Sequence, residues 1–335
     1  MTIREGCKRL RIPGRHWVGG GAVLCSLALL AACHSGSAGT GTSSMQPRRV
    51  AVVVSTLDNP YFVVLANTAA EEARRLGYQT TIFDSQDDPA EEASTFENIV
   101  AAGYSAILLN ATDDQGSVSN ARMAMQAHIP VFTMDRAIQS DQATVSQVVS
   151  DNYAGAVEVG QYFVRELNGH GRYVELLGLV GDNNTWIRSN GFHSVVGRYP
   201  GLKMVAQQSA DFDRSRALSV MDSILQAHPE IDAVFCDNDT MALGAYQALL
   251  AAHLDHAVRV FGFDGSADGI AAIEAGHMDA TAMQSPAVIA RLAAQYADLY
   301  LRGDRALPPR VLVAVSLVTR ANVARFIDGD HRSQR

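Results

Sequence analysis

Short apolar runs alternate with amphipathic stretches from Arg49 to Val318. The apolar runs have the length and the Val, Ile and Phe content of buried strands. The stretch 61–76 between the first two runs carries its apolar residues on one helical face, and Gly77 follows it as a C-terminal cap. This alternation predicts stacked strand-helix units and parallel sheets. The predicted strands are 50–55, 80–84, 106–110, 130–135, 173–179, 204–209, 233–237, 258–264, 280–284 and 311–318.

So many strands exceed one ordinary sheet. The roughly 290 residues that hold them fit two domains of about 100 to 150 residues each. Two of the runs, 131–135 and 260–264, are both apolar and both end in an aspartate. The pattern therefore predicts an α/β protein with two similarly built lobes.

Polar and aromatic side chains follow most of the predicted strands. Ligands of open parallel sheets bind beyond the carboxyl ends of the strands, so these side chains are the candidates for a binding site. Carboxylates, amides and guanidinium groups can hydrogen-bond the hydroxyls of a neutral sugar, and aromatic rings can cover its C–H faces. The candidates are Asn59, Tyr61 and Phe62 after the first strand, Asn110 after the third, Asp135 and Arg136 after the fourth, Arg188 and Phe212 in the loops after the fifth and sixth, Asn238 after the seventh, Asp264 after the eighth, and Gln284 after the ninth.

Each candidate also has an ordinary structural interpretation. Asn59 and Asn238 could cap helices. Asp135 and Arg136 could form a surface ion pair, and the two aromatic residues after the first strand could belong to the core. The placement of all of them at strand ends favours a common binding site.

The first 32 residues have the layout of a secretory signal. Basic residues between Arg4 and Arg15 precede an apolar stretch, 17–32, which is shorter than the roughly 20 residues of a membrane span. The end of that stretch, Leu30-Ala31-Ala32-Cys33, resembles a bacterial lipobox, so we expect cleavage before Cys33 and a lipid on its sulfur. An ordinary signal cleaved near the same alanines is the alternative. Residues 33–46, rich in Gly, Ser and Thr, suit a flexible tether.

Charge and cysteine content narrow the class of protein further. Without residues 1–32 the chain has 22 basic and 34 acidic residues, a net charge of −12, which does not suit a nucleic-acid partner. Cys236 is then the one cysteine besides Cys33, so no internal disulfide framework is expected. We interpret Cys236 as a small buried hydrophobic residue.

Several motifs in register resemble the periplasmic pentose and hexose receptors of ABC importers, the ribose-binding-protein-like family. The resemblance extends from about residue 50 to 318. It is carried by Ser55-Thr56-Leu57-Asp58-Asn59-Pro60-Tyr61-Phe62, Asp84-Ser85-Gln86, Leu109-Asn110-Ala111-Thr112-Asp113, Met134-Asp135-Arg136, Ala210-Asp211-Phe212-Asp213-Arg214, Asn238-Asp239-Thr240-Met241-Ala242-Leu243-Gly244-Ala245 and Gly262-Phe263-Asp264-Gly265.

The resemblance implies a fold, a site and a partner. The fold is a two-lobed periplasmic binding protein with two parallel-sheet lobes joined by a three-stranded hinge, closing on a sugar. We expect an N-terminal lobe of 47–149 plus 285–313 and a C-terminal lobe of 150–284 plus 314–335. By position, the strand-end candidates form the hydrogen-bonding set, and Tyr61, Phe62 and Phe212 form the aromatic walls. The expected partners are a monosaccharide, ABC permease subunits and, through the lipid anchor, a membrane of the periplasm or cell envelope; a monomer is expected.

Two departures from the family pattern bear on the ligand. Tyr61 stands where the family usually has phenylalanine, and its hydroxyl could contact one more polar group or a water. Trp186 lies in the segment 181–188, which is usually small, and could trim the pocket or pack at the surface. Ribose is the favoured ligand; a related pentose, a tetritol or pentitol, or a furanose-like signal molecule would also fit.

Other classes of protein are disfavoured. A sugar-responsive repressor would begin with a basic helix-turn-helix where the signal lies. The sequence has no G-x-S-x-G, G-x-G-x-x-G or P-loop motif, so we expect no enzyme activity and no cofactor. We interpret His253 and His256 as surface residues, and the aspartate-rich segment 84–89 lacks the glycine of a calcium loop, so no metal is expected. A lipid-anchored sensory protein that presents its sugar to a chemoreceptor or sensor kinase is the functional alternative.

Overall fold

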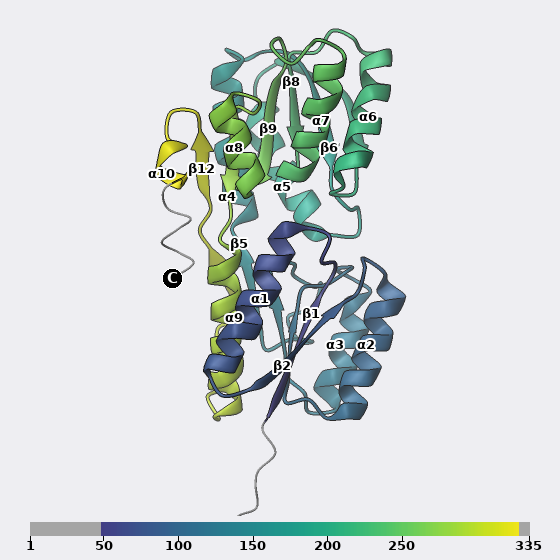
Figure 1. Cartoon of the computed structure of the whole chain (residues 1–335), viewed down its shortest axis with the longest axis vertical. Helices are drawn as coiled ribbons and strands as arrows, with labels where there is room; N and C mark the ends of the chain where they lie inside the picture. Colours follow the sequence, from purple (N-terminus) through teal and green to yellow (C-terminus); the bar gives the residue numbers. More distant parts are fainter. Residues whose placement is uncertain (1–47, 328–335) are drawn as a thin grey trace, which may run out of the picture. The chain divides into compact units, whose positions relative to one another are not determined.

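Two six-stranded sheets make up the part of the chain that this computed structural model describes, residues 48–327 (Figure 1). The order of the first sheet is β11-β5-β4-β3-β1-β2, and all its strands are parallel. Its strands are β1 (Arg49–Val54), β2 (Gln79–Asp84), β3 (Ala106–Leu109), β4 (Val131–Met134), β5 (Ser146–Ser150) and β11 (Arg310–Val313).

The second sheet repeats this arrangement in the order β12-β10-β9-β8-β6-β7, with β12 alone antiparallel to its neighbour. In both sheets the first strand along the chain lies between the second and the third. The prediction of two similarly built halves is therefore confirmed. The strands of the second sheet are β6 (His170–Leu177), β7 (Gly201–Ser209), β8 (Ala233–Cys236), β9 (Arg259–Asp264), β10 (Ala280–Met283) and β12 (Ser316–Thr319).

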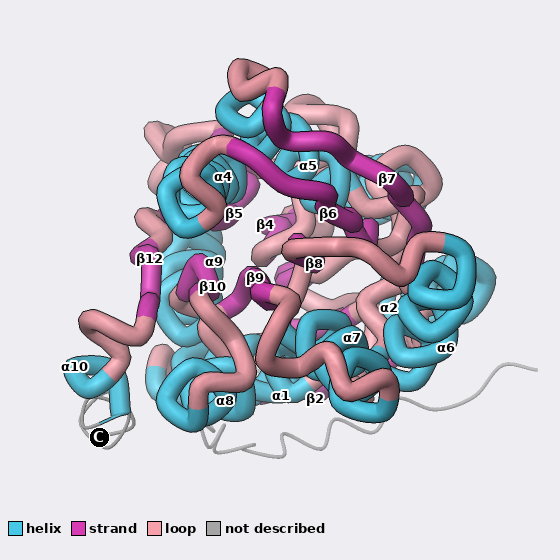
Figure 2. Tube along the Cα trace, turned by 90° about the horizontal axis from the view of Figure 1, so that it is seen from above, coloured by secondary structure: helices cyan, strands magenta, loops and turns pink. Residues whose placement is uncertain are grey.

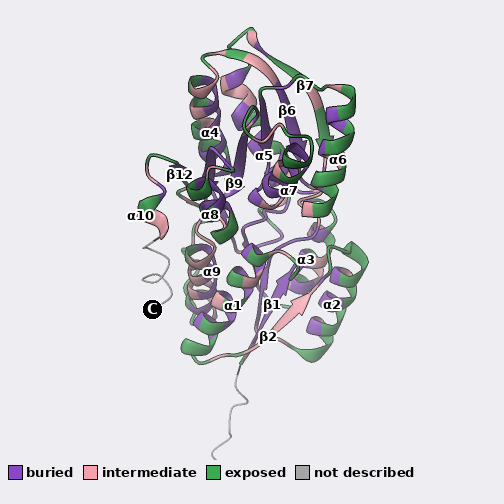
Figure 3. Ribbon diagram, turned by 45° about the horizontal axis from the view of Figure 1, so that its top comes forward, coloured by how far each residue is buried: buried purple, intermediate pink, exposed green. Residues whose placement is uncertain are grey.

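Helices cover both faces of the first sheet. On one face, Leu65 and Ile289 pack with the β1 valines in one buried cluster, and on the other face Phe96 packs with Ile107 in a second. The central strands are buried, the edge strand β2 is mostly of intermediate burial, and exposed residues lie on the outward sides of the helices (Figure 3). The helices are α1 (Pro60–Arg75) and α9 (Pro286–Leu301) on the first face, and α2 (Pro89–Ala102) and α3 (Ser117–Gln126) on the second.

The second sheet is enclosed in the same way, as the view along the molecule shows (Figure 2). The Phe192 and Phe235 rings stack 4.2 Å apart beneath one face, and Met241 is buried beneath the other. The helices are α4 (Asn152–Glu166) and α5 (Asn183–Val196) on the first face, and α6 (Arg214–Ala227), α7 (Asp239–Ala251) and α8 (Ala267–Ala275) on the second, with the short α10 (Ala324–Ile327) beside α8.

The chain passes between the sheets three times, after β5, after β10 and between β11 and β12. These three segments correspond to the expected three-stranded hinge. The described residues belong to one compact unit, and their two sheets contain the cores that hold it together. We propose that the lobes divide at these crossings; the numerical boundaries given from the sequence stay a prediction.

Two strand predictions were wrong. Strand β5 was not predicted, because three of its five residues, Ser146, Gln147 and Ser150, are polar. All five residues are nevertheless buried. The single strand predicted at 311–318 is two strands, β11 and β12, which belong to different sheets. The apolar Ala314 and Val315 between them hide the break in the sequence pattern.

Three further predictions lie outside the described residues. The signal, the tether and the lipidation of Cys33 all fall within residues 1–47. Between residues 48 and 327, the helices lack the combination of length and apolar character that crossing a bilayer requires.

Candidate functional site

A pocket of about 250 Å³, partly open to solvent, lies where the carboxyl ends of the two sheets meet. The space inside it that can hold the centre of a water-sized sphere is about 20 Å³, so the pocket is small in this conformation. Ten of the eleven residues predicted from the strand ends line it, and two further residues join them. The lining residues are Asn59, Tyr61, Phe62, Asp135, Arg136, Asp182, Asn184, Arg188, Phe212, Asn238, Asp264 and Gln284.

The start of α1 supplies the amide and the two aromatic rings of one wall. Asn59 Oδ1 accepts a hydrogen bond from the Tyr61 backbone N at 3.0 Å, and Pro60 takes the first helical position, where no amide hydrogen is needed. The Tyr61 and Phe62 rings meet edge to face, 5.6 Å apart, and both are part of the core. Asn59 is therefore a helix cap as well as a pocket residue, and the two rings are core residues as well as pocket walls.

Asp135 lies opposite this wall, directly after β4. Its Oδ1 accepts a hydrogen bond from the Tyr61 hydroxyl at 3.0 Å, and its Oδ2 lies 3.4 Å from Asn110 Nδ2. Burial raises the pKa of Asp135 to about 6, because Arg188 and Arg136 offset only part of the cost of burying the charge. Asn110 itself is absent from the lining, since it lies behind Asp135 and holds the Ser55 backbone N through its Oδ1. A direct contact between Asn110 and the ligand stays a prediction.

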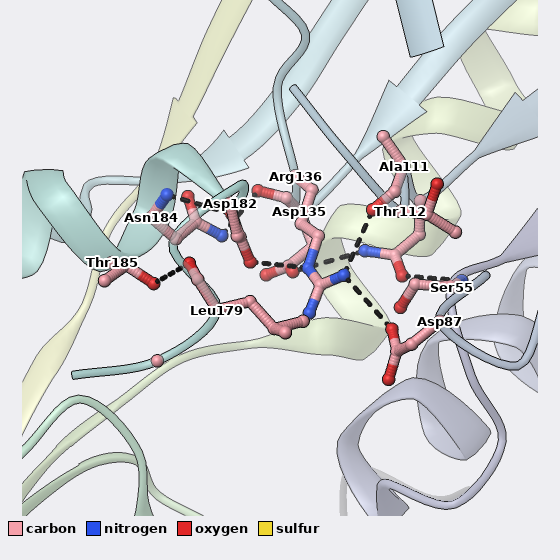
Figure 4. Close-up of polar contacts among 12 residues, drawn as sticks. Ser55, Asp87, Ala111, Thr112, Asp135, Arg136, Leu179, Asp182, Asn184 and Thr185 are labelled. Carbon is pink, nitrogen blue, oxygen red and sulfur yellow. Dashed lines mark hydrogen bonds and ion pairs between the residues drawn. The ribbon is translucent and has the colours of Figure 1, made fainter. Parts of the chain in front are cut away.

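Arg136 contacts both lobes (Figure 4). Its Nε lies 2.6 Å from Oδ2 of Asp182, which follows β6, and its Nη1 donates to the Ala111 carbonyl at 3.1 Å and lies 3.6 Å from Asp87. The guanidinium also lies over the rings of Phe62 and Phe212, which are 4.9 and 5.8 Å away. Arg136 and Asp135 are both buried, so the surface ion pair considered above does not exist.

Arg188 is the matching cation of the second lobe. Its Nε donates to Asn152 Oδ1 at 2.9 Å, and its Nη1 donates to the Asp237 carbonyl at 2.6 Å. The guanidinium lies over the Phe263 ring at 4.1 Å. Arg188 was predicted in a loop, but it lies in the second turn of α5, because Asp182 caps that helix six residues earlier.

Asp264 ends β9 next to this arginine. Its Oδ1 accepts a hydrogen bond from Gln284 Nε2 at 2.7 Å and lies 3.4 Å from Arg188 Nη1. Burial, with Asp239 and Asp135 nearby, raises the pKa of Asp264 to about 8 despite Arg188. Its backbone φ of 115° is strained for a residue with a Cβ, and Asp135 and Phe212 also have positive φ, at 67° and 60°. Such strain gathers where the surrounding structure fixes side chains for binding.

Apart from Arg136 Nε, which is ion-paired with Asp182, two buried polar atoms of the lining have no hydrogen-bond partner among the described residues. They are Asn238 Nδ2 and Gln284 Oε1, one donor and one acceptor. Asn238 Oδ1 is occupied, because it caps α7 by accepting from the Met241 backbone N at 2.9 Å. A buried polar group without a partner costs about 1 to 3 kcal/mol, so a ligand that completes both hydrogen bonds gains this free energy.

Phe212 closes the pocket from the second lobe. A side chain at Gly178 would overlap its ring, so the close approach of the β6 end to Phe212 requires glycine there. Trp186 is absent from the lining: it is 44% exposed, and its Nε1 donates to the Val180 carbonyl at 3.0 Å. Of the two alternatives for Trp186, packing at the surface is the one observed.

Sequence reasoning missed Asp182 and Asn184. Asp182 caps α5 and pairs with Arg136, and Asn184 donates to the Asp135 carbonyl at 3.4 Å across the pocket. A signal for both existed, since an aspartate that follows a predicted strand and precedes a helix is a typical N-cap at the ligand edge of a sheet. The sequence pattern predicts a loop at 181–188, and a loop gives no reason to expect Asp182 and Asn184 in the pocket.

Within 48–327, no group of three or more His, Cys, Asp or Glu side chains is arranged to hold a metal ion. Cys236 is fully buried and burial raises its pKa far above the ordinary value, which leaves it a protonated, unreactive thiol. His253 and His256 are exposed, as expected. The pocket combines planar polar groups with aromatic rings, which suits binding of a small polyhydroxy molecule.

Residues 50–305 match the family model of the periplasmic binding protein domain. The chain belongs to this family. It is 39% identical over 301 residues to the D-apiose import binding protein of Paraburkholderia graminis, covering 90% of this chain and 96% of the relative. It is 38% identical over 279 residues to the ribose import binding protein of Escherichia coli, covering 83% and 93% of the two chains.

Solved structures agree with this assignment. An ABC transporter solute binding protein from Bacillus halodurans with bound myo-inositol matches with a TM-score of 0.80 and 26% identity, over 85% of this chain and 99% of that one. The family is therefore that of the sugar-binding proteins of ABC importers, and its two-lobed fold is the one predicted. Because these relatives are transport binding proteins, the family assignment points away from an enzyme.

Proposed function

We propose that this chain is the lipid-anchored substrate-binding protein of an ABC importer and binds a small monosaccharide, an aldopentose with ribose favoured, in the pocket between its lobes. One observation carries the proposal. Amide, carboxylate, guanidinium and aromatic side chains from both sheets converge on one small pocket, and two of their buried polar atoms lack a protein partner.

The chemistry of the pocket favours a neutral sugar. The lining holds three carboxyl groups, Asp135, Asp182 and Asp264, and two arginines, Arg136 and Arg188, so its formal charge is −1 and it disfavours an anionic ligand. Sugar hydroxyls donate and accept at once, and thus can bond both Asn238 Nδ2 and Gln284 Oε1. The names of two relatives, a D-apiose import binding protein and a ribose import binding protein, favour a pentose.

Closure of the lobes supplies the signal for transport. A sugar that contacts Asn59 on one lobe and Asn238 on the other binds the closed form more tightly than the open form, and this difference shifts the population toward closure. The closed form then docks on the permease subunits.

The membrane anchor is tested separately. Cys33 is the proposed site of lipidation. Cells that express the full chain and are grown with a radiolabelled fatty acid should therefore incorporate the label into the protein. Cys33→Ser should lose the label and release the protein from the membrane fraction. Cys236→Ser is the control and should keep both; labelled, membrane-bound Cys33→Ser would reject the lipid anchor.

A thermal-shift screen of residues 46–335 tests the sugar-binding function. Pentoses, hexoses, alditols and amino acids are compared, since a ligand at 100 times its Kd adds about 2.7 kcal/mol of stability. We expect a rise of several degrees with ribose or another pentose. No shift with any sugar, or a shift with amino acids alone, would reject the proposal.

A further inference from the structure

The Tyr61 side chain is held rigidly against the pocket. It is 7% exposed, lies in the first turn of α1, and packs edge to face on Phe62 and against the core of the first lobe. Its hydroxyl therefore has one fixed position, at the junction between α1 and the end of β4. At that position it donates to Asp135 Oδ1 at 3.0 Å.

This hydrogen bond uses part of the capacity of Asp135 to accept others. A carboxylate has about four acceptor positions. On Asp135, Tyr61 occupies a position of one oxygen and Asn110 contacts the other. Asp264 differs, because its hydrogen bond and ion pair both involve Oδ1, and Oδ2 makes no hydrogen bond within the described part of the chain. Asp135 and Asp264 thus offer unequal hydrogen-bonding sets to a ligand.

The Tyr61 hydroxyl also changes what the ligand meets at this wall. Its hydrogen points to Asp135, so the oxygen presents only acceptor character to the pocket. The oxygen also occupies space in a pocket of about 250 Å³, at the wall formed by the first turn of α1. Asp135 and Tyr61 are both buried, so neither side chain can move away without breaking core packing.

We propose that the Tyr61 hydroxyl is a specificity determinant that restricts the pocket to compact sugars of pentose size and rejects their hexose counterparts. The inference rests on the proposed sugar-binding function and deepens it. The additional hydroxymethyl group of a hexose needs space, and at this wall the Tyr61 oxygen occupies some of it. One carbon more or less in a fitted pocket changes binding about 10- to 200-fold.

The matched ligands for a test are D-ribose and D-allose. In their pyranose forms the two differ by one hydroxymethyl group, and D-apiose is included as a second pentose. Tyr61→Phe removes the hydroxyl while keeping the ring. Tyr78→Phe is the control, because the Tyr78 hydroxyl also donates to a carboxylate of the first lobe, Asp298 Oδ1 at 2.8 Å, but lies outside the pocket.

Calorimetric titration of residues 46–335 gives the ratio of the allose Kd to that of the tighter-binding pentose. We expect this ratio to fall at least about tenfold in Tyr61→Phe, and to stay within about twofold of the unsubstituted protein in Tyr78→Phe. Melting temperatures of the two variants should be similar, which separates selectivity from stability.

The outcomes distinguish the two proposals. If the unsubstituted protein binds a pentose and Tyr61→Phe leaves the ratio unchanged, the role of Tyr61 is rejected and the proposed function stands. An equal fall of the ratio in Tyr78→Phe also rejects it. If the unsubstituted protein binds no sugar, the proposed function fails and the inference fails with it.

Discussion

Arg136 and Asp182 form a buried ion pair that joins the two lobes, with Nε of the arginine 2.6 Å from Oδ2 of the aspartate. Their side chains are 3% and 2% exposed. Arg136 follows β4 in the first sheet and Asp182 follows β6 in the second, so the contact requires that the lobes be closed. Loss of one partner from such a pair leaves a buried charge uncompensated, at a cost of about 3 to 5 kcal/mol.

Asp182→Asn should therefore weaken sugar binding by destabilising the closed form. The asparagine keeps the helix cap, because its side-chain oxygen can still accept from the Asn184 backbone N. We expect Kd to rise about 10- to 100-fold, mainly through faster release of the sugar. Stopped-flow binding measurements give both rate constants.

The control for this variant is Asp211→Asn. Asp211 also pairs with an arginine at 2.6 Å, but Arg216 is 59% exposed, so the pair contributes little. Affinity should stay within about twofold. An unchanged Kd in Asp182→Asn, or an equal loss in both variants, would show that the pair across the lobes does not stabilise closure.

Asp264→Ala should abolish measurable sugar binding and leave the fold intact. The Asp264 side chain orients Gln284 and lies beside Arg188. Its removal leaves Gln284 Nε2 without its hydrogen-bond partner and Arg188 without its ion-pair partner in the pocket, although Arg188 still donates to Asn152 and to the Asp237 carbonyl. We expect at least about a 100-fold loss of affinity, since each orphaned group costs about 1 to 3 kcal/mol. Asp268→Ala, at an exposed position of α8, is the control and should bind as before. Retained affinity in Asp264→Ala would contradict the site assignment.

The raised pKa values predict how stability depends on pH. Burial raises the pKa of Asp135 to about 6 and that of Asp264 to about 8, against 3.8 ordinarily. The folded protein therefore binds these protons more tightly than the unfolded chain, and the resulting stabilisation is complete below about pH 4 and lost as pH rises through the folded pKa. The free energy of unfolding of the closed, sugar-free protein should fall between about pH 4 and pH 8.

Urea denaturation at a series of pH values measures this dependence. Asp264→Asn should flatten the curve between about pH 6 and pH 8, where Asp135 has already lost its proton. Asp268→Asn should leave the curve unchanged, since Asp268 is 77% exposed. If the free energy of unfolding changes with pH equally steeply above pH 6 in Asp264→Asn and in the unsubstituted protein, the prediction is contradicted.

Trp186→Ala should leave sugar affinity within about twofold. The indole is half-exposed, bonds only to the Val180 carbonyl and is absent from the pocket lining. Fluorescence-detected or calorimetric titration of this variant measures the effect. A tenfold or greater loss would mean that the indole acts on the pocket in a way that the structure does not display.

Much of the fold could be predicted from the sequence, because most strands are apolar runs bounded by polar turns. The failures have physical causes. In β5, the polar Gln147 is buried because its side chain hydrogen-bonds the Ile138 backbone N and Asp141. These partners lie outside the strand, so the pattern of the strand residues does not reveal the contacts. The break between β11 and β12 depends on which sheet each half pairs with, and apolar content does not reveal the pairing.

The candidate site was predictable to the extent that strand ends face it. Asn59 and Asn238 were found because they follow apolar strands. Asn110 also ends a strand, but it contacts Asp135 and Ser55 and is absent from the lining. Asp182 was missed because its importance comes from an arginine of the other lobe. Contacts between lobes depend on how the two sheets approach each other, which local sequence does not encode.

A crystal structure of residues 46–335 with the sugar that most raises the melting temperature tests the central claim most directly. We expect one sugar molecule between Asp135 and Asp264, with its hydroxyls within hydrogen-bond distance of Asn238 Nδ2 and Gln284 Oε1. Its C–H faces should lie against Phe62 and Phe212. A sugar bound elsewhere, with these two polar atoms still unbonded, would contradict it.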